Sequence, residues 1–229
     1  MFAHKKLNSA SHSLRVLAAL LAYPDDTLRG HLSEMSDLLR AERALSLARR
    51  LELDALMDGL RRADALQVQA DYVELFDRGR ATSLHLFEHV HGDSRERGPA
   101  LIDLGQTYAS AGLMLTDGEL PDYLPAVLEF VSTQPRAQAQ AFLAEMAHIF
   151  NAIFGALQAR QSAYASVLGA LLELAGEKAQ PIAPLAEAPL DESWTEPVVF
   201  DGCSSKGQAK PGQPQPIHIH RQPAAGVRP

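Results

Sequence analysis

Apolar residues recur three and four positions apart through most of the chain, which is the spacing of one face of an α-helix. No segment combines strand alternation with hairpin turns, so the pattern argues against a β-sheet fold. Proline and glycine divide the apolar stretches into separate helices, for example at Pro24, Gly92 and Pro135. The spacing between helices follows no fixed period, which argues against a solenoid. We therefore predict an all-α protein, a single helical bundle.

The chain changes character at Pro181. Nine of its fourteen prolines lie between Pro181 and Pro229, together with many Gly, Gln and Ser residues. Such a segment buries too little apolar surface to offset the entropy lost on ordering. We predict a helical domain over residues 1–180 and a flexible, mostly disordered tail over residues 181–229. Two short islands interrupt the tail, one around Trp194 and one containing His218 and His220.

Charge and cysteine content exclude several classes of protein. The formal net charge is −7, so broad binding to a nucleic-acid backbone is not expected. Cys203 is the only cysteine, which rules out an internal disulfide and a cysteine-based metal cluster. The apolar run at residues 16–22 has helical spacing and is read as part of a first helix, not as a signal peptide. No uncharged run is long enough to span a bilayer, so we expect a cytoplasmic protein without direct membrane insertion.

Chemistry-bearing residues are concentrated between Asp71 and Asp103. A helix over residues 63–77 is expected to end near Gly79, since glycine commonly follows a helix. Thr82 or Ser83 can cap the next helix, whose apolar residues surround it so fully that we expect a central position. Gly92 ends that helix, and Gly98-Pro99 opens another, because proline suits the first helical turn.

One interpretation of this stretch is a metallopeptidase. His85-Leu86-Phe87-Glu88-His89 matches the H-x-x-E-H pattern, in which two histidines on one helix face bind Zn²⁺ and the glutamate activates water. A catalytic zinc also needs a third protein ligand, and no downstream helix offers an obvious one. We therefore assign no metal, cofactor or catalytic residue, and keep the zinc peptidase as an alternative.

A second interpretation concerns the charged turn after His91. Arg95 and Arg97 follow a tight turn beside Asp93 and Glu96. These charges can satisfy one another as a capping network, or they can form a polar clamp for an incoming peptide. Residue type alone leaves both possibilities open.

The same stretch resembles a known family. The residues that carry the resemblance are Tyr72 to Phe76, Ser83-Leu84, Leu86 to Gly98, Leu14 to Asp25 with gaps, and Glu119-Leu120-Pro121-Asp122-Tyr123-Leu124-Pro125 with Leu128-Glu129-Phe130. They are similar to the signature of the NarJ branch of the redox-enzyme maturation chaperones, a family that also holds the TorD and DmsD types. The similarity extends from the first helix to about Gly176.

The resemblance implies a helical, non-enzymatic chaperone, which assembles respiratory nitrate reductase without being a subunit of it. Such proteins bind the N-terminal segment of the apo catalytic subunit and support insertion of the molybdenum cofactor before membrane attachment. A helical scaffold or regulator unrelated to molybdoenzymes is the further alternative, and we expect a monomer.

The resemblance also suggests where a client segment binds. A helix-in-groove site needs apolar walls and a few polar groups. The predicted wall consists of Tyr72, Leu75, Phe76, Leu86 and Phe87. The predicted polar groups are Glu88 and Asp122 for cationic client residues, His89 and His91 for pH sensitivity, and Arg95 and Arg97 at the corner.

Overall fold

The computed structural model describes residues 10–92, 94–116 and 118–180. The described residues form helices and contain no strand, so the predicted all-α class is confirmed. The helices are α1 (Ser11–Leu21), α2 (Asp26–Glu42), α3 (Leu47–Arg62), α4 (Ala65–Tyr72), η1 (Val73–Asp77), η2 (Arg80–Thr82), α5 (Leu86–Val90), α6 (Arg97–Ser110), α7 (Leu124–Ser132), α8 (Arg136–Glu145), α9 (Ala147–Ala159) and α10 (Ala165–Ala175). The predicted tail, with Trp194, Cys203, His218 and His220, lies outside the described residues.

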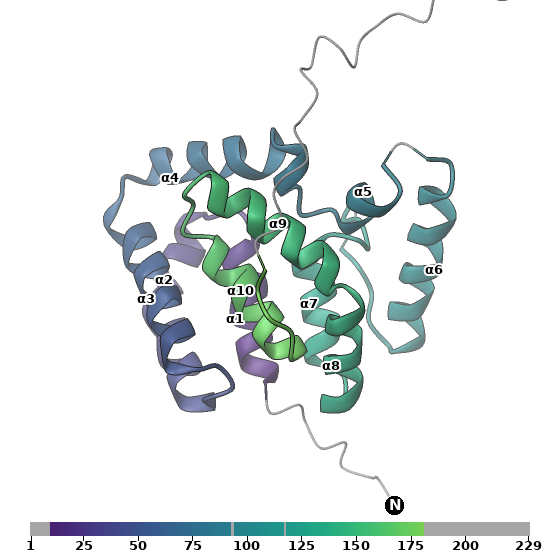
Figure 1. Ribbon diagram of the computed structural model, residues 1–229, viewed down its shortest axis with the longest axis horizontal. Coiled ribbons are helices and arrows are strands. Elements are labelled where there is room, and N and C mark those ends of the chain that lie inside the picture. Colours follow the sequence, from purple (N-terminus) through teal and green to yellow (C-terminus); the bar gives the residue numbers. More distant parts are fainter. Residues whose placement is uncertain (1–9, 93, 117, 181–229) are drawn as a thin grey trace, which may run out of the picture. The chain divides into compact units, whose positions relative to one another are not determined.

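The core is built around α1 and α10, which lie in the middle of Figure 1. Helix α1 packs against α2, α7 and α10, and α10 also packs against α3, α8 and α9. Both helices bury most of their residues; Leu17, Leu21 and Leu168 are fully buried. Burying a leucine side chain contributes about 1.5–3 kcal/mol, so the apolar spacing seen in the sequence is the main source of stability here.

Carboxylates cap the starts of α1 and α2, the first from far along the chain and the second locally. The N-terminus of α1 has no local side-chain cap, and Glu42 at the end of α2 accepts the backbone N–H of His12 and Ser13 at 3.0 and 2.6 Å. Asp25 caps α2 by accepting the N–H of Leu28 at 2.8 Å. These bonds satisfy backbone donors that a helix leaves unpaired at its start.

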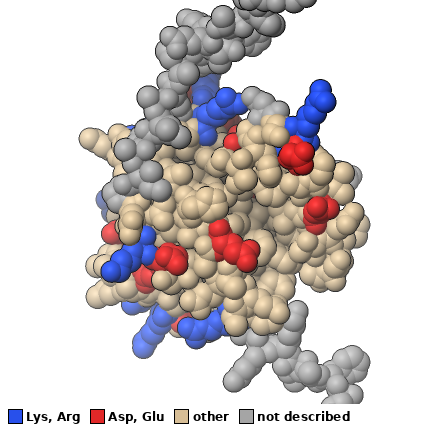
Figure 2. All heavy atoms as spheres, turned by 45° about the vertical axis from the view of Figure 1, so that its right-hand side comes forward, with Lys and Arg blue, Asp and Glu red and all other residues tan. Residues whose placement is uncertain are grey.

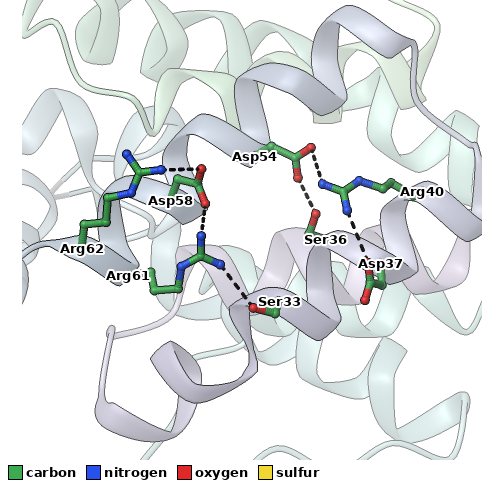
Figure 3. Close-up of polar contacts among 8 residues, drawn as sticks. All are labelled: Ser33, Ser36, Asp37, Arg40, Asp54, Asp58, Arg61 and Arg62. Carbon is green, nitrogen blue, oxygen red and sulfur yellow. Dashed lines mark hydrogen bonds and ion pairs between the residues drawn. The ribbon is translucent and has the colours of Figure 1, made fainter.

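A polar network joins α2 to α3 on the outer surface (Figure 3). Asp54 of α3 accepts hydrogen bonds from Ser36 and Arg40 of α2. Nearby, Asp58 pairs with Arg61 and Arg62 within α3. Only the Asp54 part of this network ties one helix to another through a half-buried carboxylate.

The helix predicted over residues 63–77 is present, but its last part is a π-helix instead of an α-helix. It is α-helical to Tyr72 and π-helical over Val73–Asp77. Single π turns occur often beside functional sites. The widened turn precedes Arg78 and Gly79, where the sequence predicted the break.

The sequence predicted a central helix that begins after Thr82 or Ser83 and ends at Gly92. This prediction is wrong in both the position and the length of the helix. Helix α5 has five residues, and Val90 is 52% exposed. Neither Thr82 nor Ser83 caps it with a side chain; Thr82 instead donates to the carbonyls of Leu75 and Gly79. The apolar residues that suggested a central helix divide into a buried pair, Leu84 and Leu86, and a partly exposed remainder.

Among the described helices, no single one is both long and apolar enough to cross a membrane. Helices α8 and α9 meet that length and composition only as a pair, which is bent by 61°.

Candidate functional site

The short helix α5 is held in place by a segment far along the chain. The backbone N–H of Leu86 donates to the carbonyl of Asp122 at 3.0 Å, and Leu124 N–H donates to the Leu84 carbonyl at 2.8 Å. His85 and Tyr123 form an isolated antiparallel bridge between these bonds. A five-residue helix is unstable alone, because nucleation costs more than so few bonds return. The α5 conformation therefore depends on residues 122–124.

Asp122 is the centre of this corner and is fully buried. One carboxylate oxygen accepts the N–H of Phe87 at 3.1 Å, which caps α5 from a distance. The other lies 3.4 Å from Nδ1 of His85. Burial alone would raise the pKa of Asp122, but the bonds from His85 and Phe87 and the charge of Arg97 together lower it below its usual value. The carboxylate is therefore held in its ionised form.

Arg97 supplies compensating positive charge, and His85 adds to it when its ring is protonated. The hydrogen bond to Asp122 raises the pKa of His85 above its ordinary value, although burial acts in the opposite direction. Arg97 at the start of α6 lies 3.8 Å from Asp122 and donates to Glu88 at 3.3 Å. We call Asp122, His85, Glu88 and Arg97, with the N-terminus of α5, the Asp122 corner.

The charged turn was predicted to be either a capping network or a polar clamp for a peptide. The structure decides between these two possibilities for Arg97 but not for Arg95. Arg97 is used internally, as a capping network requires, although its Nε has no hydrogen-bond partner among the described residues. Arg95 is exposed, with no ion pair to a described residue. The turn is thus anchored on one side by Arg97 and open to solvent on the other.

The three histidines do not form the arrangement that a zinc helix requires. His85 precedes α5 in extended backbone and faces Asp122, whereas Nε2 of His89 lies 2.9 Å from the Ser83 carbonyl. The ring of His91 packs edge-on against Phe87 at 5.4 Å. Within the described part of the chain, no three His, Cys, Asp or Glu side chains are grouped to hold a metal ion. The premise that His85 and His89 share one helix face is therefore wrong.

A buried aromatic cluster lies next to the corner. Tyr72 packs against Phe76 at 4.9 Å, and both contact Tyr164. The Tyr72 hydroxyl donates to the Leu21 carbonyl at 2.7 Å and lies 3.4 Å from the Tyr123 hydroxyl. Through Tyr123 the cluster is connected to the bridge that positions α5.

The structure separates the predicted site residues into two groups. Tyr72, Phe76, Leu86 and Asp122 are buried, which leaves them no direct access to a partner in this conformation. The remaining predicted residues reach the surface: Leu75, Phe87, Glu88, His89, His91 and Arg97 are partly exposed and Arg95 is exposed.

Two residues, His85 in the corner and Tyr123 beside it, were not predicted as part of a binding surface. His85 was considered only as a metal ligand, and Tyr123 only as part of a family motif. The partner of His85 lies 37 residues away, so no local spacing indicates the pair. The Asp122-Tyr123 dipeptide within the quoted resemblance was the one available signal.

Comparison with known proteins identifies the family. A family model described as nitrate reductase delta subunit matches residues 25–169, more than half of the chain. The chain is 44% identical to the nitrate reductase molybdenum cofactor assembly chaperone NarJ of Escherichia coli K12, over 71% of this chain and 69% of that protein. It is 40% identical to the probable assembly chaperone NarW of the same organism, over 71% and 68%.

A solved structure shows the same fold. It is a putative redox enzyme maturation protein from Archaeoglobus fulgidus, with a TM-score of 0.51 at 18% identity, covering 77% of this chain and 98% of that one. The resemblance inferred from the sequence is thus confirmed. The peptidase alternative is wrong, because the relatives are assembly chaperones and not enzymes. The chain belongs to the nitrate reductase delta subunit family.

Proposed function

We propose that this protein is an assembly chaperone for respiratory nitrate reductase. It binds the N-terminal segment of the apo catalytic subunit and supports molybdenum cofactor insertion before the enzyme attaches to the membrane. The observation that carries the proposal is the 44% identity to an assembly chaperone over 71% of the chain. We further propose that it acts in the cytoplasm as a monomer, without nucleic acid or a cofactor of its own.

The client segment binds on the exposed side of the Asp122 corner. Phe87 and His91 offer a partly exposed aromatic pair, and Leu75 is a partly exposed apolar side chain on η1. Glu88 and Arg97 add opposite charges to this side of the corner, and Arg95 adds an exposed cation. An amphipathic helix recognises such a surface through apolar anchors, with a few polar contacts fixing its register.

The buried residues of the predicted site have a supporting role in this proposal. Asp122 fixes the start of α5, and therefore the direction in which Phe87 and Glu88 point. Tyr72 and Phe76 form the packed base next to it. A binding surface held by buried neighbours loses less entropy when its partner binds.

Surface charge is compatible with a protein client. The face shown in Figure 2 is mainly uncharged, and its acidic side chains lie apart from one another, with Lys and Arg mostly towards the edges. It carries no continuous basic area of the kind that follows a phosphate backbone.

The proposal is tested by calorimetry with a peptide copied from the N-terminus of the catalytic subunit. Phe87→Ala is expected to weaken binding at least tenfold, since an aromatic anchor buried by its partner typically costs about 2 kcal/mol or more on truncation. Glu88→Lys is expected to weaken binding to a smaller extent, because Glu88 is already paired with Arg97. Leu66→Ala is the matched control, because Leu66 is 76% exposed at the start of α4. Circular dichroism confirms that each variant is folded. Absence of peptide binding by the unchanged protein contradicts the proposed function.

A further inference from the structure

A second surface, outside every residue of the predicted site, is hollowed between α7 and the segment that follows α6. It encloses about 400 Å³. Its floor is formed by Tyr108 and Phe130, which are 2% and 7% exposed and whose rings lie 4.8 Å apart. Leu113 and Leu115 form one wall. We call this hollow the α6–α7 groove.

The rim of the α6–α7 groove carries an apolar side chain that the fold does not use. Met114 is 95% exposed, the largest exposure among the large apolar side chains described. Its neighbours Leu113 and Leu115 both pack against the core. Methionine is flexible and polarizable, so it adapts to varied partners. Met114 and the partly exposed Leu113 and Leu115 follow one another along the chain, and contiguous exposed apolar surface is a feature of binding sites.

The charges at the groove are predominantly negative and unpaired. The carboxylates of Glu119 and Glu129 line the groove, and neither makes a hydrogen bond or ion pair with a described residue. The lining cation is Arg15, which donates to Ser132 at 3.2 Å. This differs from the Asp122 corner, where Glu88 is already paired with Arg97. Free carboxylates around an apolar hollow complement a segment that is both apolar and cationic.

The groove is connected to the Asp122 corner through one side chain. The hydroxyl of Tyr108, on the groove floor, donates to the carbonyl of Pro121 at 2.8 Å. Pro121 directly precedes Asp122. The groove floor and the Asp122 corner are therefore joined through residues 121–122.

We infer that the α6–α7 groove binds a basic amphipathic helix of the client. Its apolar side chains enter the hollow over Tyr108 and Phe130, and its Lys or Arg side chains pair with Glu119 and Glu129. The inference rests on the proposed function, because it assigns this segment to the apo catalytic subunit. It adds a contact surface and a charge requirement that the corner alone does not supply.

The test uses the full chain and measures peptide affinity by calorimetry. The probes are the N-terminal peptide of the catalytic subunit and a designed helix of leucine and lysine. The double variant Glu119→Gln/Glu129→Gln is expected to weaken binding by about twofold to thirtyfold, as two surface ion pairs contribute about 0.2–1 kcal/mol each. Its remaining affinity should depend less on salt concentration. Glu145→Gln on α8 is the control, since this glutamate is also exposed but does not line the groove.

A charge swap provides the sharper version of the test. Glu119→Lys/Glu129→Lys should lose affinity for the basic helix and gain affinity for the same design with glutamate in place of lysine. Met114→Gln should weaken both interactions, whereas Leu66→Gln, another exposed apolar position, should not. Reversal of peptide preference supports an electrostatic contact, which a merely misfolded variant cannot produce.

The outcomes separate the groove from the proposed function. If the client peptide binds and responds to Phe87→Ala but not to the groove variants, the groove inference is wrong and the function stands. If the client peptide fails to bind but the designed basic helix binds and responds, the groove is supported and the assigned client is wrong. Self-association abolished by Met114→Gln, or binding to anionic vesicles, would give the groove a different occupant and overturn the inference.

Discussion

Asp122→Ala is the substitution that most directly tests how the candidate site is held. The change removes the distant cap on Phe87 N–H and the partner of His85, and it leaves Arg97 with one carboxylate instead of two. Loss of a helix cap costs about 0.5–2 kcal/mol. Loss of a hydrogen bond to a charged group costs about 1.5–3 kcal/mol. We therefore expect the free energy of unfolding to fall by about 2–5 kcal/mol, in the range found when a buried ion pair is broken.

Thermal and urea unfolding followed by circular dichroism measure this change. For a domain of this size, each kcal/mol shifts Tm by about 2–4 °C, so Tm should fall by roughly 4–20 °C. Asp122→Asn should cost less, because its amide oxygen can still accept the Phe87 N–H. Asp37→Ala is the control: this carboxylate is largely exposed and pairs only with Arg40, so its loss should change stability by less than about 0.5 kcal/mol.

Hydrogen exchange adds a local readout to the same prediction. The amides of Leu86 and Phe87 both donate to Asp122, but only the Phe87 bond uses its side chain. In Asp122→Ala the Phe87 amide should therefore lose protection first. A loss of stability below about 1 kcal/mol, together with unchanged Phe87 protection, would show that the corner is held by other contacts.

Three further predictions concern single groups. Because the pKa of His85 is raised in the folded state, its protonation stabilises the fold. This contribution to the free energy of unfolding is fully present below the unfolded pKa of about 6.5 and is lost as pH rises through the higher folded value. Urea unfolding at a series of pH values should show this decline, and His85→Phe should abolish it. Tyr72→Phe removes the buried bond to the Leu21 carbonyl and should cost about 1–3 kcal/mol in urea unfolding, while Tyr23→Phe, at a 47% exposed residue, should cost little. Asp54→Ala should destabilise more than Arg62→Ala, since Asp54 joins α2 to α3 and Arg62 pairs only within α3 (Figure 3); equal Tm values would contradict this.

Helix positions could be predicted where periodicity and punctuation agree. In α2, Leu28, Leu32 and Leu39 are buried as their spacing predicts, and Asp25 caps the helix after the break at Pro24. Local chemistry determines these features, because both the cap and the apolar face are encoded within a few residues of one another. The helix predicted to open at Gly98-Pro99 is α6, which begins one residue earlier, at Arg97.

The corner could not be predicted because its determinants are far apart in the sequence. The cap of α5 is Asp122, and the ring of His85 is oriented by the same carboxylate. The local sequence predicted that Thr82 or Ser83 caps the helix and that His89 pairs with His85. Both predictions are wrong for the same reason. The bridge between His85 and Tyr123 brings the distant carboxylate of Asp122 to the N–H of Phe87 at the helix start. Periodicity carries no information about such a pairing.

The different charge states of the two surfaces explain why a chaperone of this kind would use both. At the Asp122 corner, Glu88 and Arg97 already satisfy one another, so a client charge gains there only what remains after displacing an existing partner. At the α6–α7 groove, the carboxylates of Glu119 and Glu129 have no partner to displace among the described residues. On the proposed function, the corner would then fix the register of the segment through apolar contact with Phe87, while the groove would supply most of the electrostatic attraction. Salt should therefore accelerate dissociation from the groove more than from the corner, because exposed charge pairs are screened and apolar contacts are not.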